Sequence, residues 1–438
     1  MLVQPHKMSF DFTDEVDIYS LEQDEDPLTR HISEEYYRKL HRQARQEYIT
    51  SLREPFTPTA PPVISTPERI KSVLRGQQNF IQRRLNLMKK VISNLRQIGV
   101  TQGRMCFRNP IFYGKFTTML LIGSGTFGQV YLGTLNKHTV IIKEAVLTSE
   151  DGPLALYEGG QDIPSKYWTV EYSIAKRLND LIISKRCPNF MLTYDLGLCL
   201  KCRSDFKQAI CSMTFMEPAS FDLAFSFKER VIGPASQLSL LSQLLIALHY
   251  VQETFQIFHS DIKAQNILIL ETPALSKTLF KYKIKDNQGS TLDTFLVENT
   301  GLVLCLSDFG VADKIGPHST FNYTIQDGML KPSSGNPGIP SEYGNDILDC
   351  IRTFLGTHSR MNKRTSQPGA HKGYPLLSAQ LTDVLRQINA DLPANLTSFK
   401  IRLRSDQAYL LNPILCLRKI LTDLGYTAPV LPVSNTFG

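Results

Sequence analysis

The chain has 438 residues, of which 42% are hydrophobic and 20% are charged, and its formal net charge is +7. This is the composition of a globular protein with enough apolar residues for one large core or two smaller ones. The longest apolar stretch, Leu238–Val251, is interrupted by polar residues and is too short to span a bilayer, so it predicts a buried helix. The mild basic excess allows a nucleic-acid or acidic-membrane partner but does not imply one.

The cysteines and the N-terminus bear on the compartment. The first residues, MLVQPHKMSFDF, lack the apolar segment of a signal peptide, so we expect reduced thiols and an intracellular protein, cytoplasmic, nuclear or both. Four cysteines are close together in the sequence: Cys187, Cys199, Cys202 and Cys211. They could ligate zinc, but they lack two paired CxxC spacings, which favours thiols buried as small hydrophobic side chains.

The first hundred residues fall into two parts. Residues 1–32 are acidic and poor in apolar side chains, which predicts a disordered tail. Residues 33–100 predict a basic helical extension with a Pro-rich linker near residues 54–67. The second helix of this extension is expected from about Pro67 to about Ile98.

This second helix has one broad apolar face and one basic face. The basic residues are Arg69, Lys71, Arg75, Arg83, Arg84, Lys89, Lys90 and Arg96. The favoured interpretation is a helix that packs on the domain through its apolar side and keeps its basic side in solvent. The alternative is that residues 33–100 dock a nucleic acid or another acidic partner, because a basic face is only an electrostatic footprint.

The sequence pattern changes after the extension. Short strand-like runs with Gly-rich turns begin near residue 111, whereas the chain after about residue 230 predicts mainly helices. Strands followed by helices favour an α+β fold in two parts, over residues 111–230 and 231–438.

A glycine-rich stretch, GSGTFGQV, spans Gly123–Val130. Glycines at 123, 125 and 128 would let the backbone approach phosphate groups closely. The stretch is followed by the strand-like residues QVYLGTL, whereas a dinucleotide-binding fingerprint leads into a helix. The pattern therefore predicts a β-hairpin over nucleotide phosphates rather than a dinucleotide site.

A lysine follows in the apolar run VIIK. Lys143 would be costly to bury without an anion, and the phosphates of a nucleotide could supply one. It also needs a carboxylate to hold it in place. Glu171 begins a helical pattern, whereas the rival Glu158 is in a Gly-rich stretch, so we favour Glu171 because a helix positions a side chain better than a loop.

Two polar segments lie beside apolar strands further along the chain. The first, HSDIKAQN, follows a predicted buried helix and contains Asp261, which could accept a hydroxyl proton, and Lys263, which could neutralise charge on a transferred phosphoryl group. Asn266 could ligate a metal ion. The second segment, LSDFG, places Asp308 after the apolar run LVLCL, where it could hold Mg²⁺.

Together these segments resemble the signature motifs of protein kinases: the glycine loop, the strand lysine, H-R-D-L-x-x-x-N and D-F-G. The resemblance covers about residues 115–430. It implies a bilobal, protein-kinase-like fold that binds ATP and Mg²⁺, or Mn²⁺ instead, and transfers phosphate to protein serine or threonine, the type indicated by Lys263. The residues it assigns to ATP are Gly123, Ser124, Gly125, Gly128, Val130, Lys143 and Glu171, with Glu217 in a hinge near Met216–Ala219.

The chain departs from the family pattern in several places. Ser260 replaces the usual arginine, which commonly pairs with a phosphate on the activation loop, so activity independent of that switch is expected. Phosphorylation of Thr320, Thr324, Ser333 or Ser334 is therefore not expected to be obligatory. The extra residues about Glu271–Gly301 are interpreted as a surface insertion. No clear A-P-E motif follows D-F-G, and Asp346 could match the buried helix aspartate that anchors the catalytic loop.

These departures keep alternatives open. A small-molecule or atypical kinase of the same fold is the runner-up, favoured by Ser260 and the weak A-P-E region. A pseudokinase scaffold has less support, because every phosphate and metal position is filled. The chain keeps the catalytic residues of the family, while its C-terminal part looks shortened. This combination resembles the protein kinases encoded by large DNA viruses.

Overall fold

The computed structural model describes fifteen stretches of the chain: 80–98, 115–125, 128–147, 170–199, 210–228, 232–255, 257–285, 290–310, 312–314, 323–326, 329–332, 341–356, 378–391, 409–410 and 412–438. These residues form two compact units. The first contains the described residues up to Ile183 and Met191–Ser220, and the second contains Ser184–Phe190 and Phe221–Gly438. The predicted acidic tail and Pro-rich linker lie outside the described residues.

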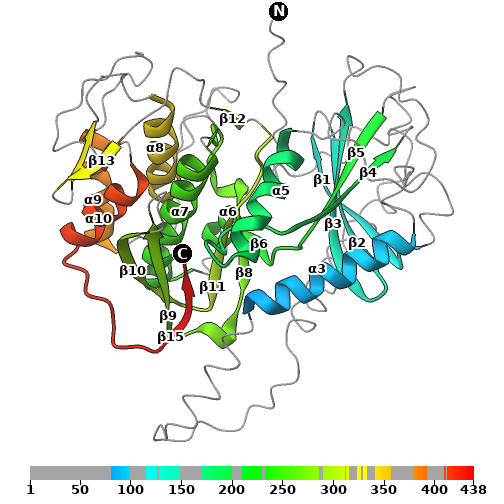
Figure 1. Cartoon of the computed structure of the whole chain (residues 1–438), viewed down its shortest axis with the longest axis horizontal. Helices are drawn as coiled ribbons and strands as arrows, with labels where there is room; N and C mark the ends of the chain where they lie inside the picture. Colours follow the sequence, from blue (N-terminus) through cyan, green and yellow to red (C-terminus); the bar gives the residue numbers. More distant parts are fainter. Residues whose placement is uncertain are drawn as a thin grey trace, which may run out of the picture. The chain divides into compact units, whose positions relative to one another are not determined.

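The first unit is built on a five-stranded antiparallel sheet (Figure 1). Its strand order is β1-β2-β3-β5-β4, with bounds Thr118–Gly125, Gly128–Leu135, His138–Leu147, Ile210–Met216 and Thr193–Cys199. Apolar side chains on these strands, among them Val140, Ile142 and Phe215, are fully buried. The strands predicted around the glycine-rich stretch are therefore present.

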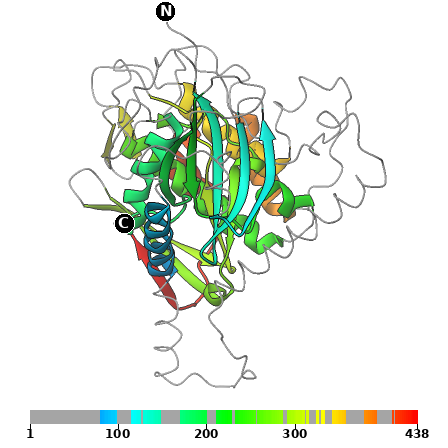
Figure 2. The ribbon, with the colours of Figure 1, turned by 90° about the vertical axis from the view of Figure 1, so that its right-hand side faces the viewer.

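Two helices pack on this sheet. Helix α5 (Val170–Ile183) contacts β4, and α3 (Phe80–Gln97) contacts β3 and β4 (Figures 1 and 2). Ile81, Val91 and Leu95 of α3 are buried, as expected for a helix whose apolar stripe meets the core. The prediction that this helix packs through its apolar side is confirmed over its described part.

The second unit has a helical core around α7 (Pro234–Phe255), whose residues 239–248 are all buried. Helix α7 packs against α8 (Ser341–Leu355) and α10 (Pro413–Asp423), and α9 (Ala379–Asp391) packs against both of these. The buried helix predicted from the apolar stretch is thus confirmed. The short helix α6 (Leu223–Lys228) precedes α7.

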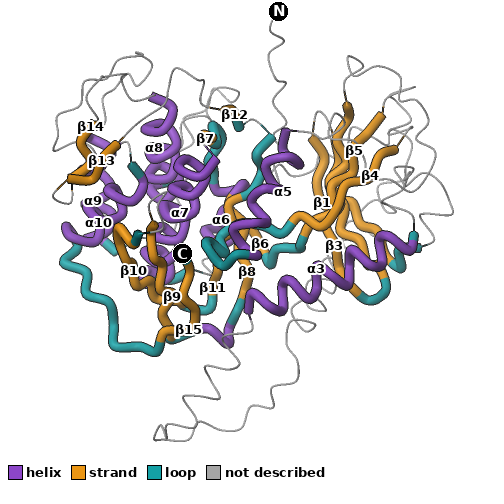
Figure 3. Tube along the Cα trace, in the orientation of Figure 1, coloured by secondary structure: helices purple, strands orange, loops and turns teal. Residues whose placement is uncertain are grey.

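Short strands frame the loops of the second unit (Figure 3). Strands β11 (Leu302–Leu306), β8 (Ile267–Glu271) and β6 (Phe221–Asp222) form one sheet in that order. Two small pairs join β12 (Asp313–Lys314) to β7 (Ile257–Phe258) and β13 (Tyr323–Gln326) to β14 (Met329–Pro332). Pairing of β8 with β11 places the ends of the two polar segments, HSDIKAQN and LSDFG, side by side.

A third sheet corrects the interpretation of residues 271–301 as a surface insertion. They form a hairpin of β9 (Thr278–Lys285) and β10 (Thr291–Asn299), and β15 (Val433–Phe437) pairs parallel with β9. The side chains of Phe280, Tyr282 and Phe437 are fully buried and their rings contact one another. The insertion thus forms part of the core, because its alternating apolar residues have a partner strand from a distant part of the sequence.

The α+β class predicted from the sequence is confirmed for the described residues. Apart from Ser184–Phe190, which belong to the second unit, the division between the units follows Ser220. No helix in the described stretches is long and apolar enough to cross a membrane.

Candidate active site

The glycine-rich stretch is the turn of a β-hairpin. Gly123 pairs with Val130 and Gly125 with Gly128, and a bulge interrupts the register between Leu121 and Gly123. Ser124 pairs with Gln129 within the same hairpin. Thr126 and Phe127 lie outside the described residues. The backbone of the stretch thus has the strand–turn–strand form that the sequence predicts.

Lys143 and Glu171 lie together in the first unit. Lys143 is on β3, the central strand, and is only 5% exposed, while Glu171 is in the first turn of α5. The Lys143 Nζ atom lies 2.8 Å from the Glu171 carboxylate. A lysine this buried needs such an anion to offset its lost hydration. The structure therefore brings together the pair that the sequence favoured, while Glu158 lies outside the described residues.

Glu217 follows β5 in the segment predicted to meet adenine. Its backbone N–H donates to the carbonyl oxygen of Leu192 at 2.9 Å. Its side chain is buried and accepts three hydrogen bonds of 2.8–3.1 Å from the guanidinium group of Arg84 on α3. The assignment of Arg84 to a solvated basic face is therefore wrong: its side chain is 3% exposed, because Glu217 supplies the charge that lets it enter the core.

Sequence reasoning missed this contact, although a signal was present. Ile81, Arg84, Met88, Val91 and Leu95 recur three and four residues apart, which is the spacing of one helix face. Arg84 thus occupies a position within the apolar stripe, and position on the helix predicted its burial better than charge did.

In the second unit, a buried carboxylate holds the loop HSDIKAQN. Asp346 of α8 accepts hydrogen bonds from the backbone N–H groups of His259 at 2.8 Å and Ser260 at 2.9 Å, and from Gln252 at 3.4 Å. Burial raises the pKa of Asp346, and these donors oppose that rise by favouring the charged form. Asp346 thus takes the anchoring position that the sequence suggested.

One residue of each polar segment, HSDIKAQN and LSDFG, has a left-handed backbone conformation. The φ angles are 65° for Ser260 and 59° for Asp308. Such conformations cost on the order of 1–3 kcal/mol each in non-glycine residues and persist where the surroundings hold them. For Ser260 the holding group is Asp346, which binds its N–H group.

His259 connects the two polar segments. Its Nδ1 atom accepts from the N–H of Asp261 at 3.3 Å, so its Nε2 atom carries the proton that is donated to the carbonyl oxygen of Ser307 at 2.8 Å. Its ring also lies 4.8 Å, centroid to centroid, from that of Phe309. The imidazole therefore ties the loop of Asp261 to the segment that carries Asp308.

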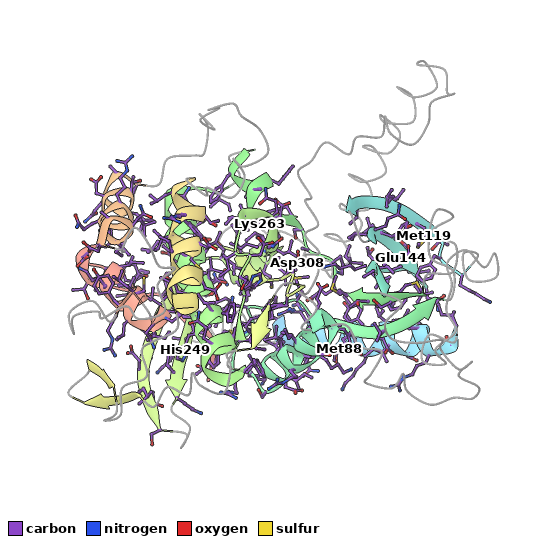
Figure 4. All side chains as sticks on the ribbon, turned by 90° about the horizontal axis from the view of Figure 1, so that it is seen from above. Met88, Met119, Glu144, His249, Lys263 and Asp308 are labelled. Carbon is purple, nitrogen blue, oxygen red and sulfur yellow. The ribbon has the colours of Figure 1, made fainter. Side chains whose placement is uncertain are left out.

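Three polar side chains gather on this loop. The Asp261 carboxylate lies 3.2 Å from Lys263 Nζ and accepts a hydrogen bond of 3.1 Å from Asn266 Nδ2. Asp261 and Lys263 are about five-sixths buried, with 16% and 15% of their side-chain surfaces exposed. Figure 4 labels Lys263 of this loop and Asp308 of the second segment. A carboxylate, an ammonium group and an amide are thus held at one place with access to solvent.

The amide oxygen of Asn266 suits a hard cation. Asn266 Nδ2 donates to Asp261, while its buried Oδ1 atom has no hydrogen-bond partner among the described residues. The backbone carbonyl oxygen of Asn266 accepts from the N–H and hydroxyl groups of Ser307, the residue before Asp308, at 3.0 and 2.9 Å. Amide and carboxylate oxygens are the ligands that Mg²⁺ takes, so the residues present fit such an ion.

The cysteine cluster gives no comparable grouping. Cys187 is buried and its thiol lies near Asn189, and Cys199 and Cys211 are partners in the β4–β5 register. Cys202 lies outside the described residues. Within the described stretches, no three His, Cys, Asp or Glu side chains are grouped as metal ligands.

Comparisons with known proteins point in the same direction as the geometry. No protein-family profile matches the chain. It is 29% identical over 270 residues to "Probable serine/threonine-protein kinase 380R" of Invertebrate iridescent virus 6, an alignment that covers 57% of this chain and 48% of that protein. It is 27% identical over 215 residues to 019R of Frog virus 3 (isolate Goorha), which also carries a provisional serine/threonine-protein kinase name; 45% of this chain and 23% of that protein are covered.

A third viral protein, "Uncharacterized protein 011L" of Invertebrate iridescent virus 3, is 29% identical over 176 residues, with 35% of this chain and 22% of that protein covered. The chain thus spans about half of the first relative and about a quarter of the other two. The chain is a divergent relative of viral proteins named as serine/threonine-protein kinases.

Proposed function

We propose that the chain is an ATP-dependent serine/threonine protein kinase, which transfers the γ-phosphoryl group of Mg-ATP to protein hydroxyl groups. The observation that carries the proposal is the cluster of Asp261, Lys263 and Asn266, held on a loop whose backbone is fixed by Asp346. The similarity to proteins named as kinases supports the same reaction class.

In this proposal Asp261 orients the substrate hydroxyl group and accepts its proton. Lys263, within 3.2 Å of that carboxylate, neutralises the charge that builds on the transferred phosphoryl group. Lys143 contacts the phosphates and Glu171 holds its ammonium group in place. The glycine-rich hairpin supplies backbone N–H groups to the phosphates.

Asn266 and Asp308 would hold the magnesium ion, or Mn²⁺ in its place. When bound, the ion supplies positive charge to the phosphate oxygens and so stabilises the charge of the transition state. The orphaned Oδ1 atom of Asn266 supports this assignment, because a buried amide oxygen without a donor is costly unless a cation meets it.

Ser260 shapes the expected regulation. Its backbone is held by Asp346, but its side chain lacks the guanidinium group that would pair with a phosphate on the activation segment. We therefore propose an enzyme that is active without phosphorylation of that segment. The similarity to viral proteins supports the further proposal that it acts inside an infected host cell.

The test is transfer of labelled γ-phosphate from Mg-ATP to a generic protein substrate by the full chain. We expect label on serine or threonine, and a fall of about a thousandfold or more for Asp261→Ala, since the variant has no base at that position. Asp383→Ala is the matched control, because the Asp383 side chain on α9 is 77% exposed.

Two outcomes would contradict the proposal. Label on small alcohols or amines but not on protein would favour a small-molecule kinase, which the missing arginine at position 260 allows. Nucleotide binding without transfer to any acceptor, in wild type and both variants, would favour a pseudokinase scaffold.

A further inference from the structure

A buried ion pair connects the N-terminal helix to the segment proposed to meet adenine. Arg84 Nη2 lies 2.8 Å from Glu217 Oε2, and Arg84 Nε lies 3.0 and 3.1 Å from the two carboxylate oxygens. Both side chains are almost fully buried, with 3% and 2% of their surfaces exposed. The guanidinium carbon also lies 5.5 Å from the ring centroid of Phe80. This fork-and-stack geometry is specific to arginine, because an ammonium group cannot form it.

Glu217, which Arg84 holds in place, also forms hydrogen bonds with the neighbouring backbone. Its N–H donates to the carbonyl oxygen of Leu192, and the N–H of Leu192 donates back to Glu217 Oε2 at 3.3 Å. The carboxylate that Arg84 grips therefore also sets the spacing of two chain segments. Because the N–H of Glu217 is taken by Leu192, adenine would have to bind other backbone groups of Met216–Ala219.

Further hydrogen bonds connect this backbone to α5, the helix whose Glu171 pairs with Lys143. Asn179 of α5 exchanges two hydrogen bonds with the backbone of Thr193, next to Leu192, at 2.6 and 3.0 Å. Glu171, two turns earlier on α5, pairs with Lys143. Polar contacts and the backbone of α5 thus join Arg84, the segment after β5 and the predicted phosphate-binding lysine within the first unit.

We infer that Arg84 is a positioning residue for the nucleotide, acting through the Glu217 carboxylate on the backbone of Met216–Ala219. This inference rests on the proposed function. It makes α3, which lies outside the resemblance to kinases, a working part of the nucleotide site. The competing account is that the pair only stabilises the fold.

The experiment compares Arg84→Met, Arg84→Lys and the control Arg83→Met in the full chain. Arg83 is the exposed neighbour on the same helix. Initial rates give kcat and the KM for Mg-ATP and Mg-GTP, measured well below the unfolding temperature of each variant. Arg84→Lys keeps a positive charge beside Glu217, so it provides a folded variant if Arg84→Met does not fold.

We expect Arg84→Lys to raise the KM for ATP about tenfold while kcat stays within about threefold, because the loss falls on nucleotide binding rather than on transfer. The preference for ATP over GTP should fall in the same variant, since the segment that reads the base is no longer fixed. Arg83→Met should match wild type.

An unchanged KM for ATP and an unchanged ATP/GTP ratio in Arg84→Lys, with only a lower melting temperature, would overturn the inference in favour of a purely structural pair. Failure of the proposed function has a different signature, because wild type and Arg83→Met would then transfer no phosphate to protein, whether or not they bind Mg-ATP. That result would overturn both proposals.

Discussion

Each unit of the molecule has a segment of proposed catalytic importance that a buried carboxylate holds in place. The groups that offset the negative charge of the carboxylate differ between the two units. In the second unit, Asp346 binds two backbone N–H groups and an amide. In the first unit, Glu217 meets the full positive charge of Arg84. Burial raises the pKa of Asp346 although its donors favour the charged form, whereas Glu217 depends on one partner side chain, that of Arg84.

The two buried carboxylates, Asp346 and Glu217, therefore depend on different parts of the chain. Asp346 binds the backbone of its loop directly, so this interaction needs only a carboxylate at the right turn of α8. Glu217 serves the backbone only while Arg84 holds it, so the first unit requires a helix contributed by the N-terminal extension. The loop of Asp261 is thus held by a residue within the region that resembles kinases. The segment after β5, which is proposed to meet the nucleotide, also depends on a residue of α3, which precedes that region.

Removal of the Asp346 carboxylate should have the largest effect. Asp346→Ala leaves the N–H groups of His259 and Ser260 without their acceptor and releases the loop of Asp261. We expect kcat to fall on the order of a hundredfold or more while the KM for ATP changes little, because misplacement of about 1 Å can cost that much. Asp349→Ala is the matched control, since Asp349 is also buried on α8. Equal loss of kcat in both variants would contradict a specific anchor.

A second ion pair of the first unit, that of Lys143 with Glu171, tests whether positioning of a side chain is as demanding as positioning of a loop. Glu171→Gln keeps the shape of Glu171 but removes the charge 2.8 Å from Lys143 Nζ. We expect kcat/KM for ATP to fall about thirtyfold, less than for the loss of Asp346, because Lys143 remains present. Glu144→Gln is the control, since adjacent residues of a strand point to opposite faces. A loss for Glu144→Gln as large as that for Glu171→Gln would refute the pairing argument.

His249 in the second unit extends the comparison, because its buried Nδ1 atom has no hydrogen-bond partner among the described residues. Burial, with a smaller effect of nearby Arg186, lowers the pKa of His249 to about 4. A histidine whose folded pKa is depressed stabilises the fold above its ordinary pKa of 6.5, and that stability is lost as the pH falls toward 4.

We therefore expect wild type to lose about 2 kcal/mol of unfolding free energy through this group between about pH 7.5 and about pH 5. His249→Phe, which keeps a ring at this position, should lose less over the same range in urea unfolding experiments. The same acid sensitivity in both proteins would show that His249 does not carry it.

Much of the fold followed from local patterns. Short strand-like runs with Gly-rich turns predicted the strands of the first unit, and the long apolar stretch Leu238–Val251 predicted α7. The sheet of β9, β10 and β15 was missed, because the partner of β9 lies about 150 residues further along the chain and local sequence does not encode which distant strand completes a sheet.

The candidate site divides in the same way. Lys143, Glu171 and the loop of Asp261 could be predicted because motif spacing and the flanking strands agree. Arg84 could not be predicted from the resemblance, which does not reach α3, and its charge suggested solvent. Only the burial of Glu217 explains why a charged residue occupies the apolar stripe.

The parallel pairing of β9 with β15 also has a consequence for the order of folding. The hydroxyl group of Ser434 donates to the carbonyl oxygen of Leu279, 155 positions earlier in the chain. Contacts of such separation close large loops and form late, so the β9–β10 hairpin should wait with Phe280 and Tyr282 uncovered. An unpaired edge beside exposed aromatic rings favours association between chains. Refolding yield should therefore depend on protein concentration until this last strand is in place.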